Sequence, residues 1–267
     1  MRITYRNHDV VDYWEKRWSD IPADHPMENT QVYPLKYAEQ TIKKNDGRIL
    51  EAGCGAGRVL RYYHNKNFDI IGIDYIQVAV DKLKEVDPLL QAEVGDITNL
   101  HFDDHSFKYI LAFGLYHNLE RDLDKAIKET YRVLEIDGYV CASFRADNLQ
   151  TKITDWYAEQ DRKSKENFRK GSKFHKMNLT LKEFTKLFTE KGFNIESIEP
   201  VENMPFLYKF SFFRSKKHKL FDENIARSEG YCLSWFGQWF QSKLMYFFPN
   251  QFCNIYVLIA KRTEKHA

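Results

Sequence analysis

A glycine-rich turn directly after a short apolar strand constrains this sequence more than any other segment. Residues 48–58 read Arg-Ile-Leu-Glu-Ala-Gly-Cys-Gly-Ala-Gly-Arg. The three glycines let the backbone bend sharply and approach a ligand without a Cβ in the way. A dinucleotide-binding turn has the spacing G-x-G-x-x-G, whereas here the third glycine comes one residue early and the acid Glu51 precedes the turn. The turn therefore predicts a ligand site at a strand end and disfavours a nicotinamide dinucleotide.

Further predicted strands bring polar residues to the same edge of a sheet. Residues 69–75 form an apolar strand ending at Asp74, and residues 91–97 end in Gly-Asp-Ile. Strands are also predicted over residues 108–115 and 139–145, the second after a helix and turn over residues 129–138. An acid at the carboxyl end of a strand in an open α/β sheet can accept hydrogen bonds from both ribose hydroxyls. Five strand ends thus converge on one crevice.

In this order and spacing, the motifs resemble those of the class I S-adenosylmethionine-dependent methyltransferases over roughly residues 30–200, and most closely the small-molecule, methyltransferase type 11-like group. The family's first motif is usually E/D-x-G-x-G-x-G. The resemblance implies S-adenosylmethionine as the cofactor. It also implies a Rossmann-like, mostly parallel seven-stranded α/β sheet with an antiparallel last strand and helices on both faces. The cofactor-binding residues implied are Glu51, Gly53, Gly55, Asp74, Tyr75, Asp96, Ile97 and Phe113.

An N-terminal helical arm, residues 1–30, precedes the glycine turn. Apolar residues at helical spacing predict a helix over residues 9–19, and a second helix is predicted over residues 34–44. In related methyltransferases such an arm folds over the cofactor pocket. Tyr13 and Arg17 are therefore candidates to contact the cofactor carboxylate or the acceptor. The alternative is that Tyr13 only helps to pack the helix down.

His117 is the candidate catalytic base. It follows a strand at its carboxyl end, where substrates approach such sheets, and its ordinary pKa near neutrality suits proton removal. Tyr116 beside it is a candidate to orient a polar acceptor, so both residues are expected to bind substrate. The alternative for His117 is a structural histidine at the start of a helix. His101 and His175 are weaker candidates because their loops cannot be placed from the sequence.

Residues 203–252 form an aromatic-rich helical insertion within a single methyltransferase domain of residues 1–267. Trp235 and Trp239 are one helical turn apart and form part of a broad apolar face. Three partners could cover this apolar face. The insertion could fold over the acceptor pocket as a lid, pack against another subunit, or lie on a membrane surface with its basic residues toward the lipid headgroups. In the first case Trp235 and Trp239 would bind substrate.

Composition limits the remaining classes of function. A net charge of +2 disfavours a dedicated nucleic-acid binder. The four cysteines contain no C-x-x-C pair, so neither a metal site nor a disulfide framework is expected. The N-terminal residues lack the apolar core of a signal peptide, and no apolar run is long enough to span a membrane. These features predict a soluble, cytoplasmic monomer or homodimer.

The resulting hypothesis is methyl transfer to an oxygen or nitrogen atom of a small acceptor that is apolar or contains a ring. One alternative is methylation of a lipid-linked or glycan acceptor at a membrane surface. Another is a non-catalytic binding protein built on a methyltransferase scaffold. An intact turn and Asp74 argue against the second alternative.

Overall fold

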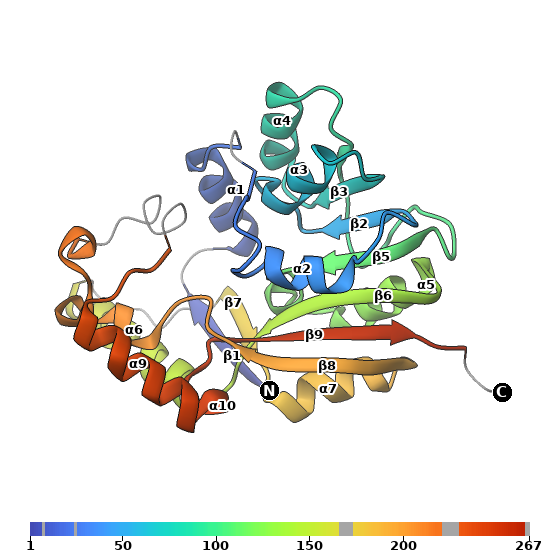
Figure 1. The fold of residues 1–267 in the computed structure, drawn as a ribbon. Helices are drawn as coiled ribbons and strands as arrows, with labels where there is room; N and C mark the ends of the chain where they lie inside the picture. The colour runs from blue at the N-terminus through green and yellow to red at the C-terminus, as the bar shows by residue number, and fades with distance from the viewer. Residues whose placement is uncertain (7–8, 24–25, 166–172, 221–229, 265–267) are drawn as a thin grey trace. The chain divides into compact units, whose positions relative to one another are not determined.

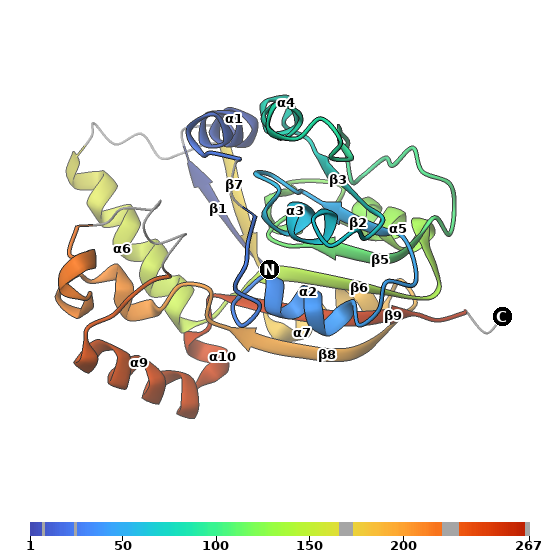
Figure 2. The ribbon, with the colours of Figure 1, turned by 45° about the horizontal axis from the view of Figure 1, so that its top comes forward.

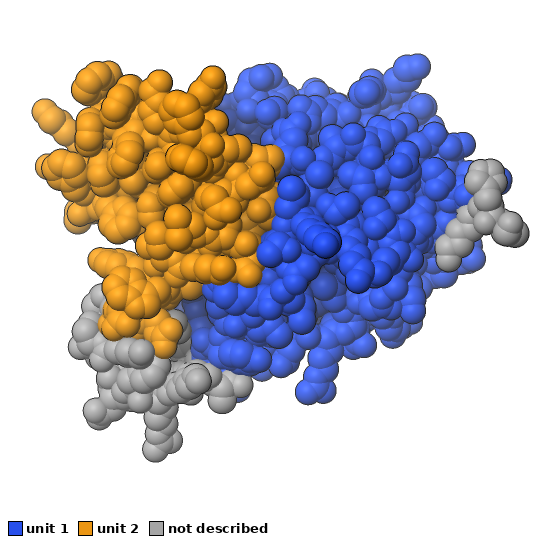
Figure 3. Space-filling view, turned by 90° about the horizontal axis from the view of Figure 1, so that it is seen from below, with its two compact units in different colours: residues 1–144, 170–199, 257–267 blue, residues 145–169, 200–256 orange. Residues whose placement is uncertain are grey.

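The computed structural model describes residues 1–267 apart from 7–8, 24–25, 166–172, 221–229 and 265–267, and it describes only the backbone of residues 161–165. The chain divides into two compact units, coloured in Figure 3. The first contains residues 1–144, 170–199 and 257–267, and the second contains residues 145–169 and 200–256. The single domain with an insertion that the sequence suggested stays a prediction; in the structure, residues 145–169 belong to the same compact unit as residues 200–256.

A seven-stranded sheet with the order β4-β3-β2-β5-β6-β9-β8 forms the centre of the first unit. Pairing is parallel from β4 to β6, and β9 runs in the opposite direction (Figure 1). The predicted α/β fold is therefore confirmed. The strands are β2 (Ile49–Ala52), β3 (Ile70–Asp74), β4 (Ala92–Val94), β5 (Phe107–Ala112), β6 (Leu134–Arg145), β8 (Phe193–Val201) and β9 (Ile255–Arg262).

Helices cover both faces of this sheet, with α2 and α3 on one face and α5 and α7 on the other (Figure 2). Because both faces are covered, β2 and β3 are buried along their whole length, as continuous apolar strands of a parallel sheet should be. The helices are α2 (Leu35–Thr41), α3 (Arg58–His64), α4 (Gln77–Val86), α5 (Leu123–Val133) and α7 (Leu181–Thr189), with a 3-10 turn η1 (Tyr116–Asn118) after β5.

Local signals set the bounds of α7. Thr180 and Glu183 form a capping box, in which the Thr180 side chain accepts from the Glu183 amide and the Glu183 side chain accepts from the Thr180 amide. Gly192, with φ 96°, reverses the chain after the helix. Both signals are local in the sequence, as a Thr-x-x-Glu spacing at the start of the helix and a glycine just past its end. The strand β6 differs from its prediction, because α5 ends at Val133 and Leu134 already pairs with Phe107 of β5.

A second sheet lies outside the predicted pattern. Strand β1 (Arg2–Arg6) pairs antiparallel with β7 (Lys173–Asn178), so that Arg2 lies opposite Asn178. No strand was predicted for either segment, because each pairs with a partner more than 160 residues away in the chain. Between β1 and the first loop lies α1 (Val10–Asp20), capped by the Asp9 side chain, which confirms the predicted arm helix.

The second unit contains the aromatic insertion. Its helices are α6 (Leu149–Lys165), α9 (Trp235–Phe247) and α10 (Pro249–Phe252), with the 3-10 turns η2 (Phe206–Lys209), η3 (Ser211–Phe213) and η4 (Lys216–His218). Phe206, Leu207, Tyr208 and Leu233 form its buried core. The Asn148 amide donates to the carbonyls of Asn250 (2.9 Å) and Cys253 (2.7 Å) and so joins α6 to α10.

Candidate active site

The glycine turn between β2 and α3 has the backbone that only glycine adopts easily. Gly53, Gly55 and Gly57 have φ values of 73°, 52° and 67°, in the left-handed region. A Cβ on Gly57 would lie 2.4 Å from the Leu83 side chain of α4. A Cβ on Gly55 would lie 2.4 Å from the Trp18 ring of α1. The turn is therefore both left-handed and tightly covered, which explains the glycine at each position.

Asp74 fastens this turn to the end of β3. Its Oδ2 accepts a hydrogen bond from the Gly55 amide (2.8 Å), and its Oδ1 accepts one from the Ile76 amide (3.0 Å). Burial raises the pKa of the Asp74 carboxyl, and these backbone amides oppose the rise. An ionised carboxylate has about four acceptor positions, so two bonds leave acceptor capacity for a ligand that donates hydroxyl groups.

Glu51 is a buried acid without full pairing. It lies in β2 and is 5% exposed, and its burial raises the pKa of the carboxyl to about 8. Among the residues that the structure describes, Oε2 of Glu51 has no hydrogen-bond partner. Because a buried polar atom without a partner is costly, this oxygen points to a ligand that donates to it. An ammonium group, such as the one on an amino acid moiety, supplies such a donor, and its positive charge would favour the ionised form of the carboxyl.

The remaining predicted cofactor residues follow β3, β4 and β5. Oδ1 of Asp96 accepts from the Thr98 amide (2.8 Å), which leaves its second oxygen for another donor, and Ile97 beside it is buried. Tyr75 is 61% exposed. Phe113 is half-buried after β5. These residues follow the carboxyl ends of three parallel strands of the same sheet, as the sequence predicted. Their contact with the cofactor stays a prediction.

Helix α1 lies against the glycine turn and against α4. The Trp18 ring covers Gly55 and stacks on Trp14, with ring centroids 5.4 Å apart. Lys82 of α4 holds the end of this helix, because its Nζ donates to the carbonyls of Trp18 (2.9 Å), Ser19 (2.8 Å) and Ile21 (2.8 Å). Neither the contact of Trp18 nor that of Lys82 was predicted from the sequence.

The two predicted arm residues lie on the same helix. Arg17 donates to the Tyr13 hydroxyl (3.3 Å) and stacks over the Trp14 ring. The Tyr13 ring also meets His175 of β7 edge to face, with centroids 6.1 Å apart. The predicted cofactor or acceptor contacts of Tyr13 and Arg17 stay predictions.

His117 lies in η1, directly after β5. Its ring meets the Phe144 ring edge to face, with centroids 6.0 Å apart. Tyr116 is fully buried, and its hydroxyl shares a hydrogen bond with Thr130 of α5 (2.7 Å). Contact of the Tyr116 hydroxyl with an acceptor would therefore have to compete with Thr130. His101 is exposed and pairs with Glu93 (3.2 Å).

A polar chain near Phe113 was missed by the sequence analysis. The Tyr33 hydroxyl bonds to Ser143 Oγ (2.9 Å), which also accepts from the Gly114 amide (2.8 Å), and the Tyr33 ring meets Phe113 edge to face. Burial raises the pKa of Tyr33 to about 12, so its hydroxyl stays protonated. Ser143 near the end of a strand was a weak signal, and Tyr33 in the preceding loop gave none.

The predicted substrate residues Trp235 and Trp239 belong to α9 in the second unit, where their side chains are 84% and 51% exposed. A role of these two residues in substrate binding stays a prediction. Across the described ranges, no cluster of three His, Cys, Asp or Glu residues could hold a metal ion.

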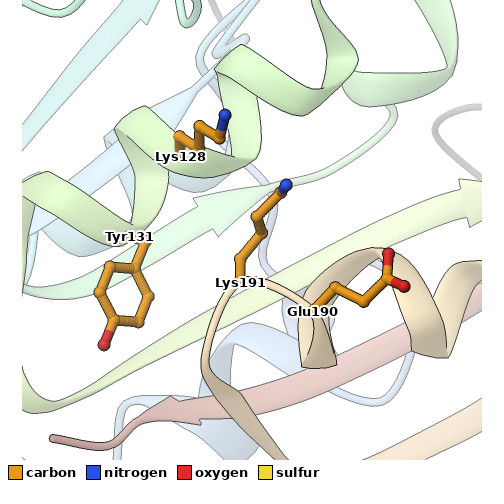
Figure 4. A pocket seen from close by; sticks show the side chains of 4 residues that line it. All are labelled: Lys128, Tyr131, Glu190 and Lys191. Atoms are coloured by element: carbon orange, nitrogen blue, oxygen red, sulfur yellow. The ribbon is translucent and has the colours of Figure 1, made fainter. Parts of the chain in front are cut away.

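A separate pocket opens beside α5 and the end of α7. Figure 4 shows its lining residues, Lys128, Tyr131, Glu190 and Lys191. Lys191 pairs there with Asp124, which also pairs with Lys128 (2.9 Å). The pocket shares no residue with the strand ends around the glycine turn and offers no group suited to the cofactor.

Comparisons with known proteins agree with this geometry. Residues 50–142, which hold the turn and the strand ends, match the family described as methyltransferase domain. An uncharacterized methyltransferase of Mycobacterium tuberculosis is 26% identical over 106 residues, covering 40% of this chain and 43% of that protein. The 2-methyl-6-phytyl-1,4-hydroquinone methyltransferase of Arabidopsis thaliana is 28% identical over 147 residues, covering 50% of this chain and 42% of that protein. The chain thus spans less than half the length of these curated relatives.

Solved structures show the same fold. A SAM-dependent methyltransferase of Methanosarcina mazei has a TM-score of 0.57 at 18% identity, covering 87% of this chain and 98% of that chain. A putative methyltransferase of Haloferax volcanii, solved with the methyltransferase activator Trm112, has a TM-score of 0.62 at 13% identity, covering 97% of this chain and 98% of that chain.

The fold and the site therefore define a Rossmann-like methyltransferase domain. Residues 50–142 of the chain thus contain a methyltransferase domain, and the fold around them resembles that of the S-adenosylmethionine-dependent methyltransferases, whose cofactor is S-adenosylmethionine.

Proposed function

We propose that this protein transfers a methyl group from S-adenosylmethionine to an oxygen or nitrogen atom of a small acceptor that is apolar or contains a ring. The observation that carries the proposal is the joint geometry of the glycine turn, the buried Glu51 and Asp74. The turn lies within bonding distance of Asp74, and Glu51 supplies a buried oxygen that needs a donor. Together they match a ligand with an ammonium group at one end and a ribose at the other.

Each predicted cofactor residue would bind one part of S-adenosylmethionine. The cofactor supplies a methyl group already activated on a sulfonium. Glu51 would hold the ammonium group, and Asp74 would hold the ribose hydroxyls in addition to its two backbone bonds. The second carboxyl oxygen of Asp96 would accept a hydrogen bond from the adenine amino group, and the apolar side chain of Ile97 would pack on the adenine ring. Aligning the acceptor atom with the methyl group contributes on the order of 7–11 kcal/mol, which makes positioning the main task of the protein.

His117 would remove the proton from the acceptor atom. It follows β5 at the same edge of the sheet as Asp74 and Asp96, and an imidazole serves as a base near neutral pH. The aromatic rings of Phe113 and Tyr33 stand beside the end of β5 and would favour an apolar or ring-shaped acceptor. The hydroquinone methyltransferase among the relatives, whose named substrate is a ring with an apolar chain, supports the same acceptor class.

Calorimetric titration with S-adenosylmethionine and S-adenosylhomocysteine tests the cofactor site. We expect micromolar binding to the wild type and at least a tenfold weaker affinity for Asp74→Ala, because the variant loses the acid at the end of β3. Asp69→Ala is the matched control, since Asp69 stands just before the same strand with its side chain 58% exposed and should leave binding unchanged. Absence of binding to the wild type would refute the proposed activity and favour a non-catalytic binding protein.

An acceptor screen tests the substrate class. Quinols, phenols and other ring-containing alcohols or amines should be methylated, whereas turnover of highly charged aliphatic acceptors alone would contradict the proposed class. Turnover only when the acceptor is embedded in vesicles would instead support the alternative of a lipid-linked acceptor. A cytoplasmic location and a monomeric or homodimeric state stay predictions from the sequence.

A further inference from the structure

Helix α9 carries its aromatic side chains on the side that faces away from the core of the second unit. Trp235, Trp239 and Tyr246 are 84%, 51% and 78% exposed, whereas Gly237 and Gln241 are buried. With 3.6 residues per turn, the three aromatic residues lie within about 40° of one another around the helix. Gly237 and Gln241 lie on the opposite side. We call Trp235, Trp239 and Tyr246 the aromatic face of α9.

Contacts on the buried side prevent α9 from turning this face inward. A Cβ on Gly237 would lie only 2.6 Å from the Phe213 carbonyl oxygen, so the helix rests directly on the backbone of η3. Oε1 of Gln241 accepts from the Leu207 amide (3.0 Å), and its amide nitrogen donates to Glu202. A rotation that buried Trp235 would expose these groups and bring a bulky ring against η3. The aromatic face is thus held outward by its own unit.

The surroundings of the aromatic face are basic. The described parts of the insertion, residues 203–220 and 230–252, contain six Lys or Arg residues and no Asp or Glu. Lys243 follows Trp239 by one turn on the exposed side of α9, and Lys216 and Lys219 are exposed in or next to η4. Phe212, 80% exposed, lies in the same segment. Lys243 thus places a positive charge beside the aromatic face, and the described segments next to it in sequence add further positive charges, which suits an apolar surface that carries negative charges.

We propose that the aromatic face of α9 and these lysines bind the surface of an anionic lipid bilayer. Trp and Tyr side chains favour the level of the lipid headgroups, where one end of the ring is in apolar surroundings and the other is hydrated. Lysines near a surface of anionic lipid add electrostatic attraction. The helix would lie in the plane of the surface, because its 13 residues are fewer than the roughly 20 needed to cross a bilayer. Indeed, no helix in the described part of the chain is both long and apolar enough to span a membrane.

A second copy of the chain is a poorer partner for this face. In a two-fold symmetric dimer the same patch meets itself, so the interface would contain Lys243 of both copies without an acid among the described residues of the insertion on either side. A bilayer with anionic headgroups supplies the missing negative charge. The inference does not depend on the acceptor or on the proposed activity, since vesicle binding can be measured without cofactor.

Vesicle flotation with the purified full chain tests this surface. The probes are vesicles of phosphatidylcholine alone and of phosphatidylcholine mixed with phosphatidylserine. The wild type should float with the mixed vesicles and release at high salt, with a blue shift of tryptophan fluorescence on binding. Trp235→Ala combined with Trp239→Ala should weaken partitioning at least about tenfold. Each of Lys216→Gln, Lys219→Gln and Lys243→Gln should weaken it about fivefold.

Leu89→Ala and Lys84→Gln are the matched controls, since both residues are exposed in the first unit and should leave vesicle binding unchanged. Circular dichroism and thermal unfolding of each variant report whether it folds. Failure of the folded wild type to bind the mixed vesicles would overturn the proposal, as would binding that neither set of variants reduces. Self-association in sedimentation velocity that Trp235→Ala with Trp239→Ala abolishes would overturn it too, because a second copy would then cover the face.

Discussion

Replacing Lys82 with Met should detach α1 from the glycine turn. The substitution keeps the length and apolar stem of the side chain but removes the ammonium group that bonds to the carbonyls of Trp18, Ser19 and Ile21. A hydrogen bond to a charged group is worth about 1.5–3 kcal/mol when shielded from water. The three hydrogen bonds share the Lys82 ammonium group as donor and lie on a partly exposed surface. We therefore expect their combined loss to weaken the docking of α1 on the glycine turn by about 1–2 kcal/mol.

This loss should appear both in dynamics and in cofactor affinity. The Trp18 ring covers Gly55 only while α1 is docked, so a destabilisation of about 1.4 kcal/mol should make the open arm about tenfold more populated. Hydrogen–deuterium exchange of the α1 amides should accelerate by that factor. The calorimetric affinity for S-adenosylmethionine should fall as well, because part of the binding energy must then redock the arm.

Lys84→Met on the same helix is the matched control, because the Lys84 side chain is exposed, whereas the Lys82 side chain is partly buried. Equal exchange of the α1 amides in Lys82→Met and Lys84→Met would refute the assignment of Lys82 as the residue that holds the arm. Faster exchange with unchanged cofactor affinity would instead refute the role of α1 in covering the cofactor site.

Three further predictions follow from the first unit. Because the pKa of Glu51 rises to about 8 on folding, the native state keeps a proton that the unfolded chain loses near the ordinary pKa of a glutamate. The free energy of unfolding should therefore decline as the pH rises from about 4.5 to 8. Glu51→Gln should abolish that decline in thermal unfolding measured as a function of pH. Gly57→Ala should lower the free energy of unfolding by about 1–3 kcal/mol in urea titration, because the residue has φ 67° and its new Cβ would press on Leu83; a smaller effect would mean that the turn relaxes. His117→Ala should reduce kcat about 100-fold and remove the acidic limb of the pH–rate profile, whereas the control His101→Ala should change neither. An acidic limb that stays unchanged in His117→Ala would exclude His117 as the base.

The parts of the fold that the sequence predicted correctly are those set by neighbouring residues. The glycine turn and the acid at the end of β3 each lie within a short stretch of sequence, and the structure has both where they were expected. The start of β6 was predicted too late, at residue 139, because Leu134 and its neighbours suit either a helix end or a strand start. Their pairing with Phe107 decided between them.

The contacts that cover the candidate site could not be predicted, because they join segments that are distant in the chain. Trp18 on Gly55, Lys82 on the carbonyls of α1 and Tyr33 on Ser143 each depend on how helices and strands pack. Nothing in the spacing of these residues indicates their partners. The aromatic pattern of α9 predicted a helix correctly, but only the burial of Gly237 and Gln241 reveals that its rings face outward.

The pairing of β1 with β7 has a consequence for the order in which this protein assembles. Arg2 and Asn178 are 176 positions apart, so closing the chain between them costs on the order of 5 kcal/mol of loop entropy before any arm contact is made. The glycine turn and its flanking strands need only short loops and can form first. On the ribosome, the strands β2 to β5 that carry the candidate site would therefore be synthesised before residue 178, with which β1 pairs.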